Sequence, residues 1–293
     1  ECDVLIAIGM RFDDRVTGKL DAYATQAKVI HFEIDPAEID KNVKSDVAVL
    51  GDVKTSLPKL LELLNTNSHP DWLQKFKDLY SIEYDKVIKN DLHPTAEGLT
   101  MGEVLKQINT QTKGEAAIVT DVGQHQMIAC RYADFNVSKS NITSGGLGTM
   151  GYGLPAAVGV QIAHPDKLVV DIAGEASILM TMQEMSTAVQ YSLPIKIFIL
   201  NNQYMGMVRQ WQELLHEKNY SESYSEALPD FVKLAEAYGC VGIRAKSPEE
   251  LDEKINEMIS IDRPVIFDCH VDQDENCFPM IPSGKPHNQM LLG

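Results

Sequence analysis

Two polar side chains, Glu175 and Asn202, follow the ends of two apolar segments and are the strongest candidates for chemistry in this chain. The apolar segments, residues 167–173 and 195–200, are rich in β-branched residues, and residues 182–191 between them have the composition and length of a helix. This order predicts a β-α-β unit with parallel strands, so that both side chains lie at one edge of the sheet. A carboxylate, an amide oxygen and a backbone carbonyl of the following turn are oxygen ligands that Mg²⁺ accepts together with phosphate oxygens and water. The pair therefore predicts a metal and diphosphate site where ligands of open α/β sheets bind.

The alternative interpretation is an ordinary turn of an α/β sheet in which Glu175 is merely solvated. The dipeptide Gly174-Glu175 alone favours this alternative. The second motif, Asn201-Asn-Gln-Tyr-Met-Gly206, adds an amide and a tight turn at the expected place and favours the metal site.

Composition limits the classes of function. Acidic residues outnumber basic residues and give a formal net charge of −16, which argues against nucleic acid or an anionic membrane as a partner. No apolar run approaches the roughly 20 residues of a membrane span. The five cysteines are odd in number and lack metal-binding spacing, so we expect a reducing, cytoplasmic environment and a small-molecule substrate. The chain opens inside a predicted strand without an initiator Met, which suggests a fragment.

The pattern of apolar segments predicts an α/β fold with two doubly wound parallel-sheet domains, the first truncated at its N-terminus. In the first domain we expect strands at residues 4–8, 28–34 and 47–50 and a helix at 55–65. In the second, a Thr100-x-x-Glu103 capping box predicts a helix start. The remaining elements are expected to alternate, with strands at 116–120, 168–173, 195–200, 241–244 and 265–271 and helices at 154–163, 182–191, 230–238 and 248–261, the last capped by Ser247. The predicted divisions are a nucleotide-binding-type domain at 1–65, a connection at 66–96, the metal and diphosphate domain at 97–272 and a tail near its site at 273–293.

Five motifs in order along the chain resemble the thiamine diphosphate (ThDP) enzymes, and among them the acetolactate synthase family. The motifs are Gly9 to Gly18, Gly123-Gln-His-Gln-Met127, Gly145 to Pro155, Asn201 to Trp211 and Phe278-Pro-Met-Ile-Pro282. The resemblance covers nearly the whole chain. It departs from the family at Glu175, where the family has Asp, and the extra methylene displaces a carboxylate whose Mg²⁺ shell tolerates little error.

The resemblance implies roles for residues in the second domain. Glu175, Asn202 and the Tyr204 carbonyl would bind Mg²⁺. The residues expected at the ThDP diphosphate are Gly123, Gln124, His125, Gly174, Ala176 and Ser177. Gly148 and Met150 would lie beside the aminopyrimidine, where a thioether supports the bent cofactor. Met207, Val208 and Trp211 would line the substrate channel, with Trp211 favouring a larger second ketoacid.

In the first domain, the resemblance implies an FAD site and a substrate contact. Gly9, Met10 and Arg11 resemble part of the FAD-binding segment, and Glu33 and Asp52 are placed to accept hydrogen bonds from ribose or ribityl hydroxyls. Solvated turn acids are the alternative for these two carboxylates. Arg15, oriented by Asp14, would bind a ketoacid carboxylate.

The implied reaction is decarboxylation of pyruvate and transfer of its two-carbon unit to a second 2-ketoacid, pyruvate or 2-ketobutyrate, in valine, leucine and isoleucine biosynthesis. The resemblance further implies a homodimer or tetramer, a regulatory small subunit and a structural FAD. A catalytic carboxylate of this family lies on an N-terminal domain, so we expect these residues alone to bind cofactor weakly and not to turn over. Another ThDP-dependent decarboxylase, oxidase or carboligase, and a non-catalytic nucleotide-binding module, are the alternatives.

Overall fold

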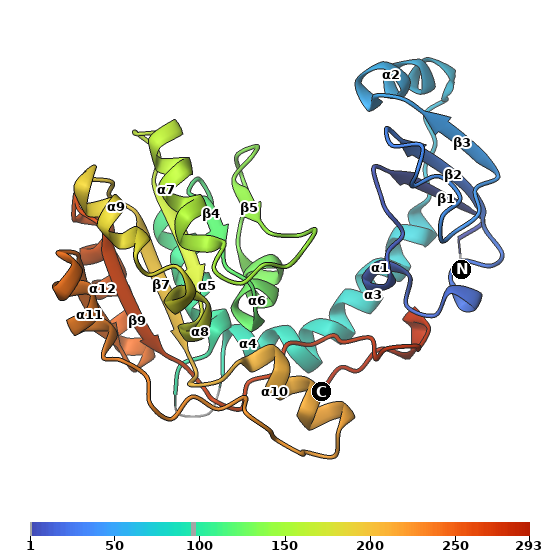
Figure 1. Ribbon diagram of the computed structural model, residues 1–293. Helices are drawn as coiled ribbons and strands as arrows, with labels where there is room; N and C mark the ends of the chain where they lie inside the picture. The colour runs from blue at the N-terminus through green and yellow to red at the C-terminus, as the bar shows by residue number, and fades with distance from the viewer. Residues whose placement is uncertain (1, 95–97) are drawn as a thin grey trace. The chain divides into compact units, whose positions relative to one another are not determined.

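The computed structural model describes residues 2–94 and 98–293 (Figure 1). Tertiary contacts divide this part of the chain into two compact units. The first comprises residues 2–87 together with 278–293, and the second comprises residues 88–94 and 98–277.

The first unit contains a parallel sheet of strands β1 (Val4–Ile8), β2 (Lys28–Glu33) and β3 (Val47–Leu50), in that spatial order. The short helix α1 (Asp14–Thr17) and a 3₁₀ turn (Leu20–Ala22) lie between β1 and β2. The buried residues Ala7, Phe12 and Val29 form a small core on one face. The expected strands and their parallel arrangement are therefore confirmed.

The predicted connection at 66–96 is largely helical. Helix α2 (Val53–Leu63) is followed by α3 (Pro70–Glu83), which continues through a π-helical turn (Tyr84–Ile88) into α4 (Lys89–Leu92). Residues 95–97, where the connection was expected to end, lie outside the described residues.

The C-terminal segment, which includes a 3₁₀ turn at His287–Gln289, packs within the first unit. The backbone N–H of Lys19 donates to the carbonyl of Lys285 at 3.1 Å, and the rings of Tyr23 and His287 meet edge to face at 5.5 Å. Its expected place near the active site, like the domain boundaries predicted from the sequence, stays a prediction.

In the described part of the second unit, six parallel strands form a sheet in the order β5-β4-β6-β7-β9-β8. The strands are β4 (Ala117–Thr120), β5 (Asn141–Thr143), β6 (Val169–Ala173), β7 (Lys196–Asn201), β8 (Val241–Ala245) and β9 (Val265–His270). The helices of this unit, besides α4, are α5 (Met101–Thr112), α6 (Gln124–Tyr132), α7 (Gly153–Ala163), α8 (Glu175–Met180), α9 (Glu184–Gln190), α10 (Gly206–Leu215), α11 (Phe231–Tyr238) and α12 (Pro248–Ser260).

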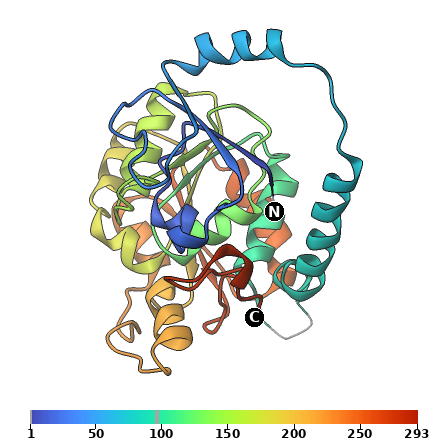
Figure 2. The same ribbon diagram turned by 90° about the vertical axis from the view of Figure 1, so that its right-hand side faces the viewer.

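Two apolar cores, one on each face, hold this sheet. Successive residues of a strand point to opposite faces, and in β7 Phe198 and Leu200 belong to one core while Ile197 and Ile199 belong to the other. Helices α5, α6 and α12 cover the first face, and α7, α8, α9 and α11 cover the second. Helix α10 covers neither face and lies beyond the ends of the strands (Figures 1 and 2). A doubly wound sheet with one open carboxyl edge results.

Both faces are covered because the strands are apolar on both sides. All six residues of β7 and all five of β6 are buried, a pattern typical of central parallel strands. The register pairs Ala173 of β6 with Ile199 of β7, so the residues that follow the two strands emerge side by side at the same edge.

Of the two predicted N-cap residues, Thr100 makes a side-chain capping hydrogen bond and Ser247 does not. Thr100 forms the expected capping box, since its hydroxyl accepts from the Glu103 N–H at 3.2 Å and the Glu103 carboxylate accepts from the Thr100 N–H at 3.1 Å. Ser247 is the N-cap residue of α12, as predicted, but its side chain makes no capping hydrogen bond.

The two caps make a matched pair for a stability measurement. We expect Thr100→Ala to lower the free energy of unfolding by about 1 kcal/mol, because an N–H at the start of α5 loses its acceptor. Ser247→Ala should change it by less than about 0.5 kcal/mol. Urea denaturation of both variants measures the difference, and equal losses would contradict the assignment.

No helix within residues 2–94 and 98–293 is long and apolar enough to cross a membrane. The five cysteines are all free thiols.

Candidate cofactor and metal site

A cavity of about 250 Å³ opens at the carboxyl edge of the second unit's sheet. Its walls come from the β4–α6 turn, the loop before α7, the β6–α8 turn, and the β7–α10 turn with the start of α10. The lining residues are Met101, Val122, Gly123, Gln124, His125, Gly148, Met150, Gly174, Glu175, Ala176, Ser177, Leu200, Asn202, Tyr204, Met205, Gly206, Met207 and Val208. Segments up to about a hundred residues apart in sequence thus meet in one place.

Glu175 and Asn202 lie together at this cavity. The carboxylate of Glu175 accepts the backbone N–H of Gln203, the residue after Asn202, and both side chains are buried, with exposures of 3% and 2%. The Asn202 amide oxygen accepts the N–H of Tyr204 at 3.1 Å. The expected convergence of carboxylate, amide oxygen and the Tyr204 turn is therefore present.

The pKa of Glu175 is raised to about 7, mainly by burial and to a smaller extent by the charge of Asp268, while backbone N–H groups, among them that of Gln203, oppose the shift. A carboxyl group in such surroundings lacks a positive partner. A divalent cation beside Glu175 would supply that partner.

His125 lies against two glycines. A Cβ atom at Gly123, which has φ +155°, or at Gly174 would come within 2.7 Å of the His125 ring, so both positions require glycine for this packing. Burial lowers the pKa of His125 to about 3, and its Nε2 has no hydrogen-bond partner among the described residues. An anion beside the ring would favour the protonated form, in which both ring nitrogens donate.

The residues expected around the rest of the cofactor are only partly brought together. Met150, Met207 and Val208 line the cavity, whereas Trp211, further along α10, is not among the lining residues and is 38% exposed.

The expected FAD and ketoacid contacts belong to the first unit and have local partners there. The Glu33 carboxylate accepts the N–H groups of Ile34 and Asp35 at 2.8 and 3.2 Å. Asp52 caps α2 by accepting the Lys54 N–H at 2.8 Å. The guanidinium of Arg11 pairs with the Asp13 carboxylate at 2.7 Å, and that of Arg15 lies 3.9 Å from the Asp14 carboxylate. The remaining expected contacts in this unit are Gly9 and Met10.

Comparison with known protein families decides which family this arrangement belongs to. Residues 121–269 match the family model described as the C-terminal TPP binding domain of thiamine pyrophosphate enzymes, and residues 1–60 match the central domain of the same enzymes. The chain belongs to the thiamine pyrophosphate enzyme family. The first match contains the β4–α6, β6–α8 and β7–α10 turns of the cavity.

Several curated proteins are similar over 99–100% of this chain. The chain is 46% identical to the acetolactate synthase large subunit of Parasynechococcus marenigrum and 42% identical to that of Haemophilus influenzae. It is 43% identical to the acetolactate synthase isozyme 3 large subunit of Escherichia coli. The chain spans about half the length of these relatives, between 47% and 51%.

The residues present fit the thiamine pyrophosphate group and its metal. The cavity provides the space, the Nε2 of His125 without a described partner provides a group for an anion, and the buried Glu175 carboxylate provides a group for a cation. Among the described residues no group of three or more His, Cys, Asp or Glu forms a metal site.

Two buried carboxyl groups of this thiamine pyrophosphate domain were not predicted from the sequence. Asp121 accepts the N–H groups of Val122 and Gly151 at 2.8 Å each, whereas neither oxygen of fully buried Asp171 has a hydrogen-bond partner among the described residues. Burial and the charge of Asp121 raise the pKa of Asp171 well above its usual value. A Cβ at Gly153 would lie 2.5 Å from Asp171 Oδ1, so the pair lies directly beneath the start of α7.

Gly206 ends the motif that begins at Asn201, but no role of its own was predicted for it from the sequence. A Cβ at this position would lie 1.8 Å from Gln124 Oε1 and 3.0 Å from Asn202 Nδ2. Helix α10 can begin this close to Gln124 and Asn202 only because residue 206 has no side chain.

We expect Gly206→Ala to lower the free energy of unfolding by about 1–3 kcal/mol through overpacking and to weaken cofactor binding. Gly159→Ala is the matched control, because nothing lies within 4 Å of a Cβ at that position of α7 and alanine favours a helix by up to about 1 kcal/mol. Thermal unfolding with and without ThDP and Mg²⁺ measures both effects; equal behaviour of the two variants would show that the close approach is unimportant.

Proposed function

We propose that this chain forms the cofactor-binding part of an acetolactate synthase, which decarboxylates pyruvate and joins its two-carbon unit to a second 2-ketoacid. The observation that carries the proposal is the convergence of Glu175, Asn202 and the Tyr204 turn at one buried cavity. Identities of 42–46% to proteins named as acetolactate synthase large subunits support the choice of reaction within the family.

In this proposal, Mg²⁺ is held by the Glu175 carboxylate, the Asn202 amide oxygen and the Tyr204 carbonyl. The diphosphate lies against Gly174, Ala176 and Ser177 on one side and against Gly123, Gln124 and His125 on the other. Small residues let the backbone approach the phosphates, and His125 supplies a donor once the anion has favoured its protonated form.

Bound ThDP supplies the electron sink for decarboxylation, so the chain's own residues mainly bind, orient and exclude water. Gly148 and Met150 support the aminopyrimidine side, and the apolar side chains of Met207 and Val208 keep the reacting centre dry. Trp211 and Arg15 are assigned to the acceptor ketoacid, Trp211 as a wall and Arg15 as a carboxylate ligand.

FAD, bound by Gly9, Met10, Arg11, Glu33 and Asp52, is assigned a structural role. We also assign a homodimeric or tetrameric state and a regulatory small subunit. The words "large subunit" in the relatives' names support the small subunit alone. The odd number of free cysteines supports a reducing, cytoplasmic compartment.

A product assay tests the proposal. The protein carrying this chain, in its longest natural form, is supplied with pyruvate, ThDP, Mg²⁺ and FAD, and acetolactate is converted by acid to acetoin and measured by colour. We expect acetolactate, and 2-acetohydroxybutyrate when 2-ketobutyrate is added. Acetaldehyde or an oxidised product would indicate another ThDP enzyme, and the absence of ThDP binding by calorimetry would indicate a non-catalytic module; either result contradicts the proposal.

A further inference from the structure

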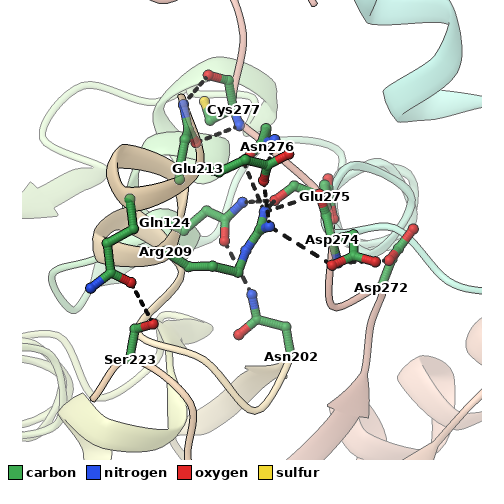
Figure 3. A network of polar contacts seen from close by, with 12 residues as sticks. Gln124, Asn202, Arg209, Glu213, Ser223, Asp272, Asp274, Glu275, Asn276 and Cys277 are labelled. Atoms are coloured by element: carbon green, nitrogen blue, oxygen red, sulfur yellow. Dashed lines mark hydrogen bonds and ion pairs between the residues drawn. The ribbon is translucent and has the colours of Figure 1, made fainter. Parts of the chain in front are cut away.

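A chain of hydrogen bonds runs from the metal turn to a buried arginine on α10 (Figure 3). Asn202 Nδ2 donates to Gln124 Oε1 at 3.1 Å, and Gln124 Nε2 donates to the backbone oxygen of Glu275. Arg209 Nη2 donates to the same Glu275 oxygen at 2.8 Å. Residues far apart in sequence are thus joined in one line that ends at a proposed Mg²⁺ ligand.

The donor and acceptor groups in this chain of hydrogen bonds determine which way the side-chain amides of Gln124 and Asn202 are oriented. A backbone carbonyl can only accept, so Gln124 must present its NH₂ group to Glu275, and its oxygen must then face Asn202. Asn202 must in turn present its NH₂ group to Gln124. Its own oxygen is left on the other side, where it accepts the Tyr204 N–H and keeps a second lone pair for a cation.

Arg209 holds in place the backbone carbonyl of Glu275, which accepts the hydrogen bond from Gln124. Its side chain is 1% exposed, and Nη2 also donates to the Asp274 carbonyl at 3.0 Å and to the Asn276 side chain at 2.8 Å. Nη1 pairs with Glu213 one helical turn away at 2.7 Å. The guanidinium therefore fixes three consecutive residues after β9 against α10, as Figure 3 shows.

The neighbouring residue Gln210 also attaches the segment after β9 to α10. Its side chain both donates to the Cys277 carbonyl at 3.0 Å and accepts the Cys277 N–H at 2.8 Å. Helix α10 also supplies Met207 and Val208 to the cavity, so one helix carries both the anchor of the amide line and part of the cavity wall.

We propose that Gln124 and Arg209 are positioning residues that orient the Asn202 side-chain amide, so that its oxygen and not its NH₂ group faces the bound cation. The inference rests on the proposed function, because it takes the Mg²⁺ and ThDP site as its starting point. It assigns the Gln124 side chain to Asn202 in addition to the contact with diphosphate made by its loop. Arg209 acts on the cation only through Glu275, Gln124 and Asn202.

The test measures Mn²⁺ binding in the presence of saturating ThDP, from the loss of the free-ion signal in electron paramagnetic resonance. Gln124→Met keeps the size of the side chain but removes the amide, and we expect about 10- to 100-fold weaker Mn²⁺ binding, as for other groups that orient a metal ligand. Gln212→Met is the matched control, since Gln212 is a bridging amide on α10, the helix of Arg209, and bonds Ser221 and Ser223 rather than any residue between Asn202 and Arg209 in this chain of hydrogen bonds. Its Mn²⁺ affinity should equal that of the unmodified protein.

An Asn202→Asp background separates orientation from any direct or merely structural role of Gln124. A carboxylate has two equivalent oxygens, so its orientation no longer matters. In this background Gln124→Met should cost nothing or improve Mn²⁺ binding, because it removes an oxygen that faces the new carboxylate. A loss as large as in the unmodified background would overturn the inference.

Arg209→Met completes the experiment. If Arg209 acts through Gln124, the double variant Gln124→Met/Arg209→Met should bind Mn²⁺ no more weakly than the weaker single variant. Because Arg209→Met leaves Glu213 without its buried partner, far-UV circular dichroism must show a folded protein, and Arg209→Met/Glu213→Met replaces it otherwise. Additive losses would overturn the role of Arg209. Failure of the unmodified protein to bind Mn²⁺ with ThDP would overturn the proposed function itself. Equal Mn²⁺ binding by all variants would instead overturn only the positioning role of Gln124 and Arg209.

Discussion

Replacement of Glu175 by Ala is expected to weaken Mg²⁺-dependent binding of ThDP at least about 100-fold, or ~2.8 kcal/mol. Glu175 is the one anionic side chain in the proposed ligand set, and its carboxylate contacts the turn that carries the other two ligands. Without it the cation would be held by neutral oxygens in a buried site, where an unpaired charge is costly. Isothermal titration with ThDP at fixed Mg²⁺ measures the loss.

Two further variants serve as a control for the charge change and as a test of whether glutamate binds the cation as well as aspartate. Glu226→Ala removes the same charge from an exposed position that does not line the cavity and should leave the affinity unchanged. Glu175→Asp, which introduces the residue typical of the family, should stay within about tenfold of the unmodified protein, since Glu175 already reaches the Asn202–Gln203 turn. A much larger gain from Glu175→Asp would instead indicate a degraded site and favour a non-catalytic module.

Replacement of Asp171 by Asn is expected to stabilise the protein at pH 8 and to remove much of the fall in stability as pH rises. The folded-state pKa of Asp171 is raised, so the folded chain keeps a proton that the unfolded chain loses. The stability that this proton provides is complete below the unfolded-state pKa and is lost as pH rises toward the folded-state pKa, by up to ~1.4 kcal/mol per pH unit. Asn resembles the protonated acid at every pH, so its advantage should grow with pH.

Urea denaturation between pH 4 and pH 9 provides the measurement. Asp121→Asn is the comparison, because Asp121 has two N–H donors that stabilise its charge whereas Asp171 has none. We expect the proton of this coupled pair to reside on Asp171, so Asp171→Asn should flatten the pH profile more than Asp121→Asn. The opposite order would place the proton on Asp121.

The strands and the edge at which they end could be predicted from the sequence. The strands that carry the site are short runs of β-branched residues, and both β6 and β7 end within one residue of the expected positions. Parallel order then follows from the helix between them. Glu175 and Asn202 could be placed at one edge from the sequence because both lie within two residues of the end of a strand.

Helix α10 and the chain of hydrogen bonds from Asn202 through Gln124 to Arg209 could not be predicted in this way. Residues 206–215 begin with Gly206, lack a capping side chain and include a buried arginine, so local signals do not indicate a helix. Gln124, Arg209 and Glu275 are 66 to 151 residues apart along the chain. Their contacts depend on how the ends of β4, β7 and β9 meet, and a single sequence does not record which amide faces which carbonyl.

The expected Ser247 cap is confirmed in its position but not in its side-chain hydrogen bond. The residue type and the following Pro248 and Glu250 satisfy the local pattern of a helix start. The Ser247 side chain makes no capping hydrogen bond, and Glu250 accepts the Lys246 N–H at 2.9 Å and pairs with Lys254 at 3.3 Å. The local pattern placed the start of α12 correctly and its hydrogen bonds incorrectly.

A crystal structure of the protein with ThDP and Mn²⁺, measured at a wavelength where Mn²⁺ scatters anomalously, tests the central claim most directly. The predicted result is one anomalous peak bound by a Glu175 carboxylate oxygen, Asn202 Oδ1, the Tyr204 carbonyl and diphosphate oxygens. A peak elsewhere with ThDP bound, or a peak from which Glu175 or Asn202 points away, would contradict it.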